Sequence, residues 1–247
     1  MTTTDTSLLE MLQAGVHFGH RISKRHPKMN PFIFGVRNGI SIIDLEKTKE
    51  QLDKTLIAIE EVAAQGKTIL FLGTKRQIQP IVKSAAEAAG MPYVVERWLG
   101  GLLTNYQHVR QLMKKLTDLK EARDRGEWTQ RYTKKERLVF EREIDRLENL
   151  VGGIESIKGL PDMLMVFDCK KEKTAIAEAA RLTIPIAAIT DTNINPTLIT
   201  YPIPANDDGI KSVTYIATKV AEAVKRGQAR IKVVIPPTTE VKPALKK

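Results

Sequence analysis

Short runs of continuous apolar residues, each followed by a helical pattern, constrain this fold more than any other feature of the sequence. The runs are TILFLG at residues 68–73, DMLMVFD at 162–168 and IPIAAIT at 184–190. Because nearly every position is apolar, these runs are typical of strands that are buried on both faces. Strands that alternate with helices at this spacing form a parallel sheet with helices on both faces. The sequence therefore predicts an α/β fold.

Weaker patterns complete this alternation. They are strands at 92–96 and 201–205, and helices near 77–89, 171–182 and 208–226. A longer amphipathic helix is predicted from the N-cap Asp44 to about Gln65, because apolar residues recur there at helical spacing. Those apolar residues are Leu52, Leu56, Ile59 and Val62.

The N-terminal region has a different pattern. A short helix is predicted at residues 7–14, with Ser7 as its N-cap. The segment PFIFGVRNGISIID, at residues 31–44, then places apolar runs on either side of Asn38 and Gly39. Asn-Gly between two such runs is the strongest local signal for a tight turn, so a β-hairpin is expected here.

Residues 104–156 interrupt the alternation of strands and helices. Apolar residues recur there at spacings of three and four in two stretches, which a polar segment containing Gly126 separates. They are Val109, Leu112, Leu116 and Leu119 in the first stretch, and Phe140, Ile144, Leu147, Val151 and Ile154 in the second. Two such stripes predict two helices that pack along one seam as an inserted antiparallel coiled-coil hairpin.

These patterns divide the chain into four parts. Residues 1–43 form a basic N-terminal segment with a hairpin, and residues 44–103 and 157–226 form the α/β domain. Residues 104–156 form the coiled-coil hairpin. Residues 227–247 form a basic tail, rich in proline and lysine, that is expected to be disordered when free.

The net charge of +10 is concentrated near the two ends of the sequence. Residues 11–43 contain five basic residues and no acidic residue, and residues 225–247 contain seven basic residues and one acidic residue. Such segments attract polyanions, because each neutralised phosphate releases condensed counterions. A generally basic soluble protein with an unstructured tail would show the same distribution.

The compartment can also be predicted. No apolar run reaches the roughly 18 residues that a membrane span requires, and no secretory signal is visible. Cys169 is the only cysteine, so a disulfide within the chain is impossible. We therefore expect a cytoplasmic protein without membrane contact.

Polar residues at the ends of the predicted strands leave a nucleotide-dependent α/β enzyme as an alternative. Ligands bind at the carboxyl edge of a parallel sheet, and Lys75, Arg97, Asp168 and Asp191 are expected there. The two cations could hold a phosphate and the two carboxylates a metal ion. Catalysis is disfavoured, because the sequence has no GxGxxG motif, no nucleophile paired with a base and no paired acids. Helix capping and turn formation explain the two aspartates more simply.

His17 and His20, in HFGH, are weak candidates for metal ligands. Their spacing would place both on one helical turn, but no cysteine and no nearby carboxylate completes a site. We expect no metal and no cofactor, and we favour structural or RNA-contacting roles for both histidines.

Seven motifs in a fixed order give the sequence a family resemblance. They are AGVHFGH, HPKMNPFIFGVRNGISIIDLEKT, LFLGTKRQ, RWLGGLLTN, TKKERLVFEREIDRLE, GGI with GLPDMLMVFD, and IPIAAITDTNINP with YPIPANDD. Over residues 8–226 the chain resembles the ribosomal protein S2 family of the bacterial small subunit. It departs from that family at Arg25, where many relatives have a tryptophan.

The resemblance implies a flavodoxin-like sheet with a protruding coiled-coil hairpin. It also implies a non-enzymatic structural constituent of the small ribosomal subunit that binds small-subunit rRNA and supports assembly and translation. The implied partners are that rRNA and neighbouring ribosomal proteins, including the OB-repeat protein S1. A homo-oligomer is not expected in the functional state.

Candidate rRNA contacts follow from charge and position. Contacts with backbone phosphates are expected from Arg21, Lys24, Arg25, Lys28, Arg37, Lys75, Arg76 and Arg97. Hydrogen bonds to RNA are expected from Asn38, Thr104 and Asn105. Near the turn of the coiled coil, Lys134, Lys135 and Arg137 are expected to touch RNA or a neighbouring protein. An adaptor, whose coiled coil docks another protein and whose basic ends are incidental, is a third alternative.

The stretch VVERWLGGLLTNYQ, at residues 94–107, resembles a phosphate-binding loop but has no catalytic partners. Its position between a strand and the coiled coil suggests a junction. Trp98 is expected to anchor this junction, and Gly100 and Gly101 to permit the sharp exit of the chain from the sheet. Arg97 is expected to meet a phosphate of a folded RNA.

Overall fold

A computed structural model of the chain describes residues 7–128 and 132–234. Five parallel strands form the central sheet, in the order β5-β4-β6-β7-β8. They are β4 (Ile69–Leu72), β5 (Tyr93–Val94), β6 (Met163–Val166), β7 (Ile186–Thr190) and β8 (Tyr201–Pro204). Counted along the chain this order is 2-1-3-4-5, the doubly wound order of flavodoxin.

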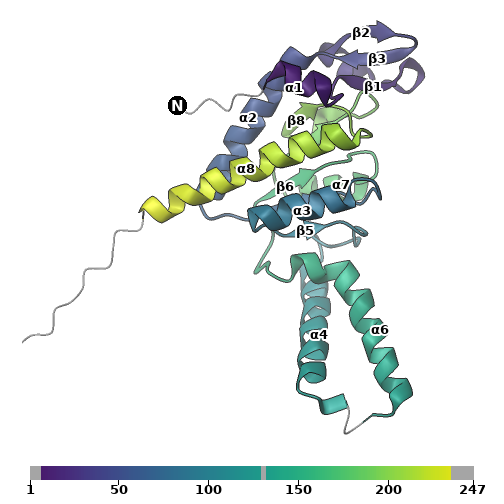
Figure 1. The fold of residues 1–247 in the computed structure, drawn as a ribbon, viewed down its shortest axis with the longest axis vertical. Helices are drawn as coiled ribbons and strands as arrows, with labels where there is room; N and C mark the ends of the chain where they lie inside the picture. The colour runs from purple at the N-terminus through teal and green to yellow at the C-terminus, as the bar shows by residue number, and fades with distance from the viewer. Residues whose placement is uncertain (1–6, 129–131, 235–247) are drawn as a thin grey trace, which may run out of the picture.

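Helices cover both faces of this sheet (Figure 1). One face packs on α2 (Leu45–Ala64), α3 (Gln79–Ala89) and α8 (Ile210–Val234), and the other packs on α7 (Lys173–Arg181). Successive strand residues point to opposite faces. Phe71 therefore lies in the first core and Leu72 in the second, and both are fully buried. This double burial explains why the strands are continuous apolar runs, as predicted.

Of two long helices, one begins where the sequence predicts and the other ends later than predicted. Helix α2 begins where predicted, since the Asp44 carboxylate accepts hydrogen bonds from the backbone N–H groups of Glu46 (3.0 Å) and Lys47 (3.5 Å). Helix α8 runs to Val234, beyond the predicted end at residue 226. Residues 227–234 are therefore helical and not part of a disordered tail. The remaining tail, 235–247, and residues 1–6 lie outside the described residues.

A small antiparallel sheet precedes the central one, in the order β1-β3-β2. Its strands are β1 (Phe18–Arg21), β2 (Ile33–Arg37) and β3 (Ile40–Ile43). Asn38 and Gly39 join β2 to β3 with φ angles of 51° and 76°, as a tight turn of this kind requires. Strand β1 is not predicted by the sequence, and the short 3-10 helices Ile22–Lys24 and Pro27–Phe32 follow it. Ser7 is the N-cap of helix α1 (Leu8–Gln13), as predicted, but its side chain makes no capping hydrogen bond.

Two helices extend away from the sheet as an arm (Figure 1). They are α4 (Tyr106–Asp124) and α6 (Lys134–Val151). The residues buried along these helices are Val109, Met113 and Leu116 on α4, and Ile144, Leu147 and Val151 on α6. At the far end, Phe140 packs on the rings of Trp128 (centroids 5.2 Å apart) and Tyr132 (5.0 Å). No helix of residues 7–128 or 132–234 is long and apolar enough to span a membrane.

The arm returns to the sheet through a tight contact at Gly153. This residue lies in the 3-10 helix Gly152–Ile154, beside the edge strand β5. A Cβ atom at Gly153 would lie 2.3 Å from the Tyr93 carbonyl oxygen and 2.7 Å from its ring. Strand β5 is also shorter than the predicted segment 92–96, since it comprises only two residues.

We expect Gly153→Ala to lower the free energy of unfolding by about 1–3 kcal/mol, because the methyl group would overpack this junction. Urea denaturation of the full chain measures this quantity. Gly159→Ala is the matched control, since a Cβ atom at Gly159 meets no atom within 4 Å. Equal stability of the two variants would contradict the proposed close packing.

Candidate nucleic-acid interface

The basic N-terminal segment lies against the carboxyl edge of the central sheet. The backbone N–H of His20 donates to the Thr192 hydroxyl (2.9 Å), and that of His26 donates to the Thr192 carbonyl (2.8 Å). Nζ of Lys28 donates to the Thr197 hydroxyl (2.6 Å). Gly19 is required here, because a Cβ atom would lie 2.6 Å from the Thr192 methyl group. Contacts with the loop after β7 thus fix the path of the basic residues between β1 and β2.

Most cations of this segment remain available to an external anion. Arg21, Lys24 and Lys28 are exposed, and Arg25 is half-buried. None of these four has a carboxylate within 4.0 Å among residues 7–128 and 132–234. Arg37, exposed at the β2–β3 turn beside the exposed Asn38, also has no such partner within the described chain.

Lys75 differs from these residues, although the sequence predicts the same role for it. Its ammonium group forms an ion pair with Asp208 and lies 3.8 Å from Asp168 and 3.9 Å from Asp207. Burial alone would lower the pKa of Lys75, but the hydrogen bond to Asp208 and the neighbouring carboxylates outweigh it and raise that pKa. The positive charge of Lys75 is therefore balanced by carboxylates of the protein itself. Its neighbour Arg76 is exposed.

The carboxylates around Lys75 form an acidic cluster with His20. Nδ1 of His20 lies 3.0 Å from Asp191, and Nε2 lies 3.4 Å from Asp208. The hydrogen bond to Asp191 raises the pKa of His20, as do the charges of the acidic cluster, although burial opposes them. Burial and the charges of Asp191 and Asp168 raise the pKa of Asp207 to about 7. The His20 imidazole thus connects β1 to the edge of the sheet through its ion pairs with Asp191 and Asp208.

Three members of this cluster could also hold a divalent cation. His20, Asp191 and Asp207 each offer a ligand atom, and these atoms lie within 4.8 Å of one another. Imidazole and carboxylate ligands suit zinc. His17 is not part of this group, because its ring packs on Phe18 with centroids 4.1 Å apart. The helical turn predicted for the two histidines is wrong, since residues 18–21 form strand β1.

The junction between sheet and arm is organised by a carboxylate that the sequence does not single out. Glu178, on α7, accepts hydrogen bonds from the Trp98 indole (3.1 Å) and from the backbone N–H of Gly101 (2.8 Å). It also accepts from the backbone N–H groups of Leu103 (3.1 Å) and Thr104 (3.4 Å). Trp98 is buried, so its predicted role as an anchor is confirmed. Of the two glycines, Gly101 alone has a positive φ, of 87°.

The other predicted contact residues lie in separate places. Arg97, Thr104 and Asn105 are exposed at the base of the arm. Lys134 and Lys135 are exposed at the start of α6, at the end of the arm that is far from the sheet (Figure 1). The structure therefore brings together the segment 21–28 and the sheet edge, but not the arm residues.

Sequence reasoning missed a group of cations beside Arg76. The Asp168 carboxylate accepts hydrogen bonds from the backbone N–H groups of Lys170 (2.9 Å) and Lys171 (3.1 Å), which turns the chain after β6. This confirms Asp168 as a turn residue. Both lysines and Lys173 are exposed at the carboxyl edge. The dense lysines of CKKEK after a predicted strand were the signal that could have identified them.

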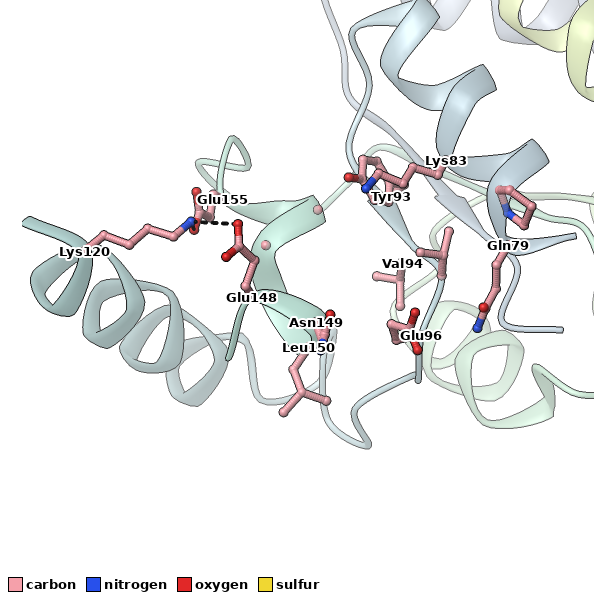
Figure 2. A pocket seen from close by; sticks show the side chains of 14 residues that line it. Gln79, Lys83, Tyr93, Val94, Glu96, Lys120, Glu148, Asn149, Leu150 and Glu155 are labelled. Carbon is pink, nitrogen blue, oxygen red and sulfur yellow. Dashed lines mark hydrogen bonds and ion pairs between the residues drawn. The ribbon is translucent and has the colours of Figure 1, made fainter. Parts of the chain in front are cut away.

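A cavity of about 390 Å³ lies where the arm meets the sheet (Figure 2). Its charged lining includes Lys120, which is paired with Glu148 (3.3 Å) and Glu155 (3.1 Å). The strand-end residues that a nucleotide-dependent enzyme would use, Lys75 and Asp168 among them, do not line it. The cavity and the candidate phosphate ligands therefore do not form one active site.

Comparison with known proteins gives a consistent result. A family model described as "Ribosomal protein S2" matches residues 11–227. Three curated relatives, each called "Small ribosomal subunit protein uS2", align with 90% of this chain. The relative from Coprothermobacter proteolyticus is 45% identical over 82% of its own length, and that from Sulfurimonas denitrificans is 46% identical over 86%. The relative from Campylobacter jejuni is 47% identical over 84% of its length.

We expect Glu178→Gln to lower the free energy of unfolding by about 2–4 kcal/mol, because an amide cannot accept from all these buried donors. Glu121→Gln, at an exposed position of α4, is the control and should be neutral. Urea denaturation measures both variants. A loss equal to that of the control would show that the Glu178 hydrogen bonds do not hold the junction.

The same carboxylate predicts a pH dependence. Burial alone would raise the pKa of Glu178, but the hydrogen bonds from Gly101, Trp98, Leu103 and Thr104 outweigh it and lower that pKa below 4.5. Its contribution to stability is therefore complete above pH 4.5 and is lost as the pH falls through the lowered value. The difference in the free energy of unfolding between the wild type and Glu178→Gln should therefore shrink as the pH is lowered from 6 to 3, and a constant difference would contradict this role.

Proposed function

Since this chain belongs to the ribosomal protein S2 family, we propose that it is a structural, non-enzymatic constituent of the small ribosomal subunit and binds the rRNA of that subunit. The bacterial small subunit is cytoplasmic, which agrees with the expected localisation. The observation that supports the rRNA contact is the set of cations at residues 21–37, which have no carboxylate partner within the described chain and lie against the edge of the sheet. Phosphate contacts of this kind position a protein on folded RNA.

Three groups of residues make up the proposed rRNA interface. The central group is Arg21, Lys24, Arg25 and Lys28, and Arg37 with Asn38 extends it along the β2–β3 turn. The second group is Arg76 with the lysines at 170, 171 and 173, on the neighbouring edge of the sheet. The third group is Arg97, Thr104 and Asn105 at the base of the arm. Lys75 is left out of the interface, because its charge is already neutralised by carboxylates.

The nucleotide-dependent enzyme is disfavoured by the same geometry. Lys75, the cation best placed for a phosphate at the carboxyl edge, is surrounded by three carboxylates. His20 from the N-terminal segment occupies the adjoining acidic group. A phosphate entering this edge would meet the carboxylates of Asp168, Asp191 and Asp208, which repel it.

We further propose that α4 and α6 form a coiled coil that serves as a second contact arm. Their buried residues recur at heptad spacing, and Lys115 on α4 pairs with Glu143 on α6 at 2.7 Å. Such cross-helix ion pairs and the aromatic packing at the far end join the two helices along the arm. The arm is thus an insertion in the α/β domain formed by 44–103 and 157–226.

An apolar groove supports the contact with the OB-repeat protein S1. The groove, of about 610 Å³, lies between α1 and the β2–β3 hairpin. Its exposed apolar lining comprises Leu8, Leu9, Leu12 and Phe34, and Phe34 is 80% exposed. Contiguous exposed apolar residues are typical of surfaces that bind another protein. We propose that an apolar segment of S1 occupies this groove.

Sedimentation of a lysate with RNA crosslinking tests the proposed function as a whole. The chain should travel with the small subunit and crosslink to its rRNA. Saturable binding of a free nucleotide with turnover, in protein freed of RNA, would support the enzyme instead.

The phosphate contacts predict a specific salt dependence. Replacing Arg21, Lys24 and Arg25 together by glutamine should weaken rRNA binding and reduce the slope of log K against log salt by about 2–3, at roughly 0.7–0.9 per phosphate contact. Filter binding over a range of KCl concentrations measures this slope. The control variant replaces Lys54, Lys83 and Lys219 by glutamine, which removes the same number of positive charges outside the proposed interface. An unchanged slope in the first variant would exclude the assignment.

The groove predicts a separable effect. Phe34→Asp should weaken capture of S1 by at least about tenfold, because a charge would enter the apolar contact, and should leave rRNA binding unchanged. Ile210→Asp, at a position that is 56% exposed, is the control. Pull-down of purified S1 by assembled subunits gives the readout, and equal capture by both variants would place S1 elsewhere.

A further inference from the structure

The outer face of α6 carries a surface that the three groups of the proposed rRNA interface do not include. Leu138 and Val139 are 46% and 57% exposed. At about 100° per residue, they lie on the side of the helix opposite to the buried residues Ile144 and Leu147. Two cations lie on the same side, one turn before and one turn after this apolar pair. We call the four residues the outer patch: Lys135, Leu138, Val139 and Arg142.

Folding of the arm does not account for the apolar pair. The inner side of α6 already buries its apolar residues against α4. The outer side of a solvated helix is normally polar. Among the described residues of the arm, the exposed large apolar side chains are Tyr132, Leu138 and Val139, all at its far end. Their concentration there indicates a contact and not a random surface.

The charge of the outer patch is positive. Lys135 and Arg142 have no carboxylate within 4.0 Å among residues 7–128 and 132–234, whereas Lys115 and Arg146, nearer the sheet, are both paired with Glu143. Glu136, which follows Lys135 in the sequence, is engaged by Thr133, whose backbone N–H and hydroxyl each donate to it at 2.9 Å. The patch is therefore an apolar pair between two available cations.

We propose that the outer patch docks an acidic amphipathic segment of a neighbouring protein in the small subunit. Leu138 and Val139 would pack on the apolar stripe of that segment, and Lys135 and Arg142 would pair with its carboxylates. Aliphatic side chains offer no stacking surface to bases and no charge to phosphates, so a protein fits better than RNA. The inference rests on the proposed function, because it takes its partner from the assembled subunit.

A photocrosslinking residue at position 139 tests this contact in assembled subunits. The same residue at position 57 is the matched control, because Ile57 is also 57% exposed but lies on α2. We expect position 139 to crosslink to a protein, at a peptide with net negative charge, and position 57 not to crosslink to that peptide. Crosslinking of position 139 to rRNA, to an uncharged or basic peptide, or to nothing would overturn the inference.

A charge reversal in the same full-length chain adds a second readout. Lys135→Glu with Arg142→Glu should lower the crosslink yield at position 139 by at least about fivefold, because like charges would then face each other. Lys54→Glu with Lys219→Glu, which makes the same change of net charge outside the arm, should leave the yield unchanged. Sedimentation of every variant with the small subunit distinguishes failure of the docking inference from failure of the proposed function. Normal sedimentation with an unchanged yield overturns the docking inference alone, whereas loss of sedimentation in the wild-type chain overturns the proposed function with it.

Discussion

The carboxylate of Glu178 fixes the arm to the sheet domain. It lies on α7, a helix of the sheet domain, and accepts hydrogen bonds from the loop that leads into the arm. A single buried anion thereby satisfies backbone N–H groups that the sharp turn at Gly101 would otherwise leave unpaired. Tyr93 and Gly153 close the other side of the same junction. The direction of the arm is therefore set by close packing and hydrogen bonds at its base.

A fixed arm matters because the candidate contact surfaces are far apart in the fold. The basic segment 21–28 lies at the sheet edge, and Lys134 and Lys135 lie at the other end of the molecule (Figure 1). A protein that contacts a large RNA through separated surfaces loses affinity if those surfaces move independently, since ordering them costs free energy on binding. Under the proposed function, the buried core of the arm and its aromatic end contribute to binding as well as to stability.

Much of this architecture follows from local sequence patterns, and the exceptions have tertiary causes. Strands β4, β6 and β7 were predictable because both their faces are buried, and Asp44 was predictable as a cap because it acts on the adjacent turn. Strand β1 was not, because HFGH has no alternating pattern and is held by pairing with β3 and by Thr192. Helix α8 extends beyond its local signal, where Arg226 and Arg230 pair with Glu60 of α2.

In the candidate site, too, features set by local sequence were predictable and those set by tertiary contacts were not. Exposed cations such as Arg21 and Lys24 were predictable, since nothing nearby in the sequence neutralises them. The pairing of Lys75 was not predictable, because Asp207 and Asp208 are distant in the sequence and only the fold of the sheet brings them next to it. Glu178 was hidden for a similar reason. In the sequence it is an ordinary glutamate of a helix, and only the fold brings the Trp98 loop to it.

The carboxyl edge of a doubly wound sheet is where proteins of this architecture bind small ligands. Here the chain fills much of that edge with its own residues. Thr192 accepts hydrogen bonds from the N-terminal segment, His20 lies among the aspartates, and Lys75 is held by three carboxylates. The groups that would recognise a nucleotide are thus consumed in joining the N-terminal segment to the sheet. This connection leaves Arg21 and Lys24 exposed beside the half-buried Arg25, so the edge that serves catalysis in enzymes of this fold here supports the proposed surface for RNA.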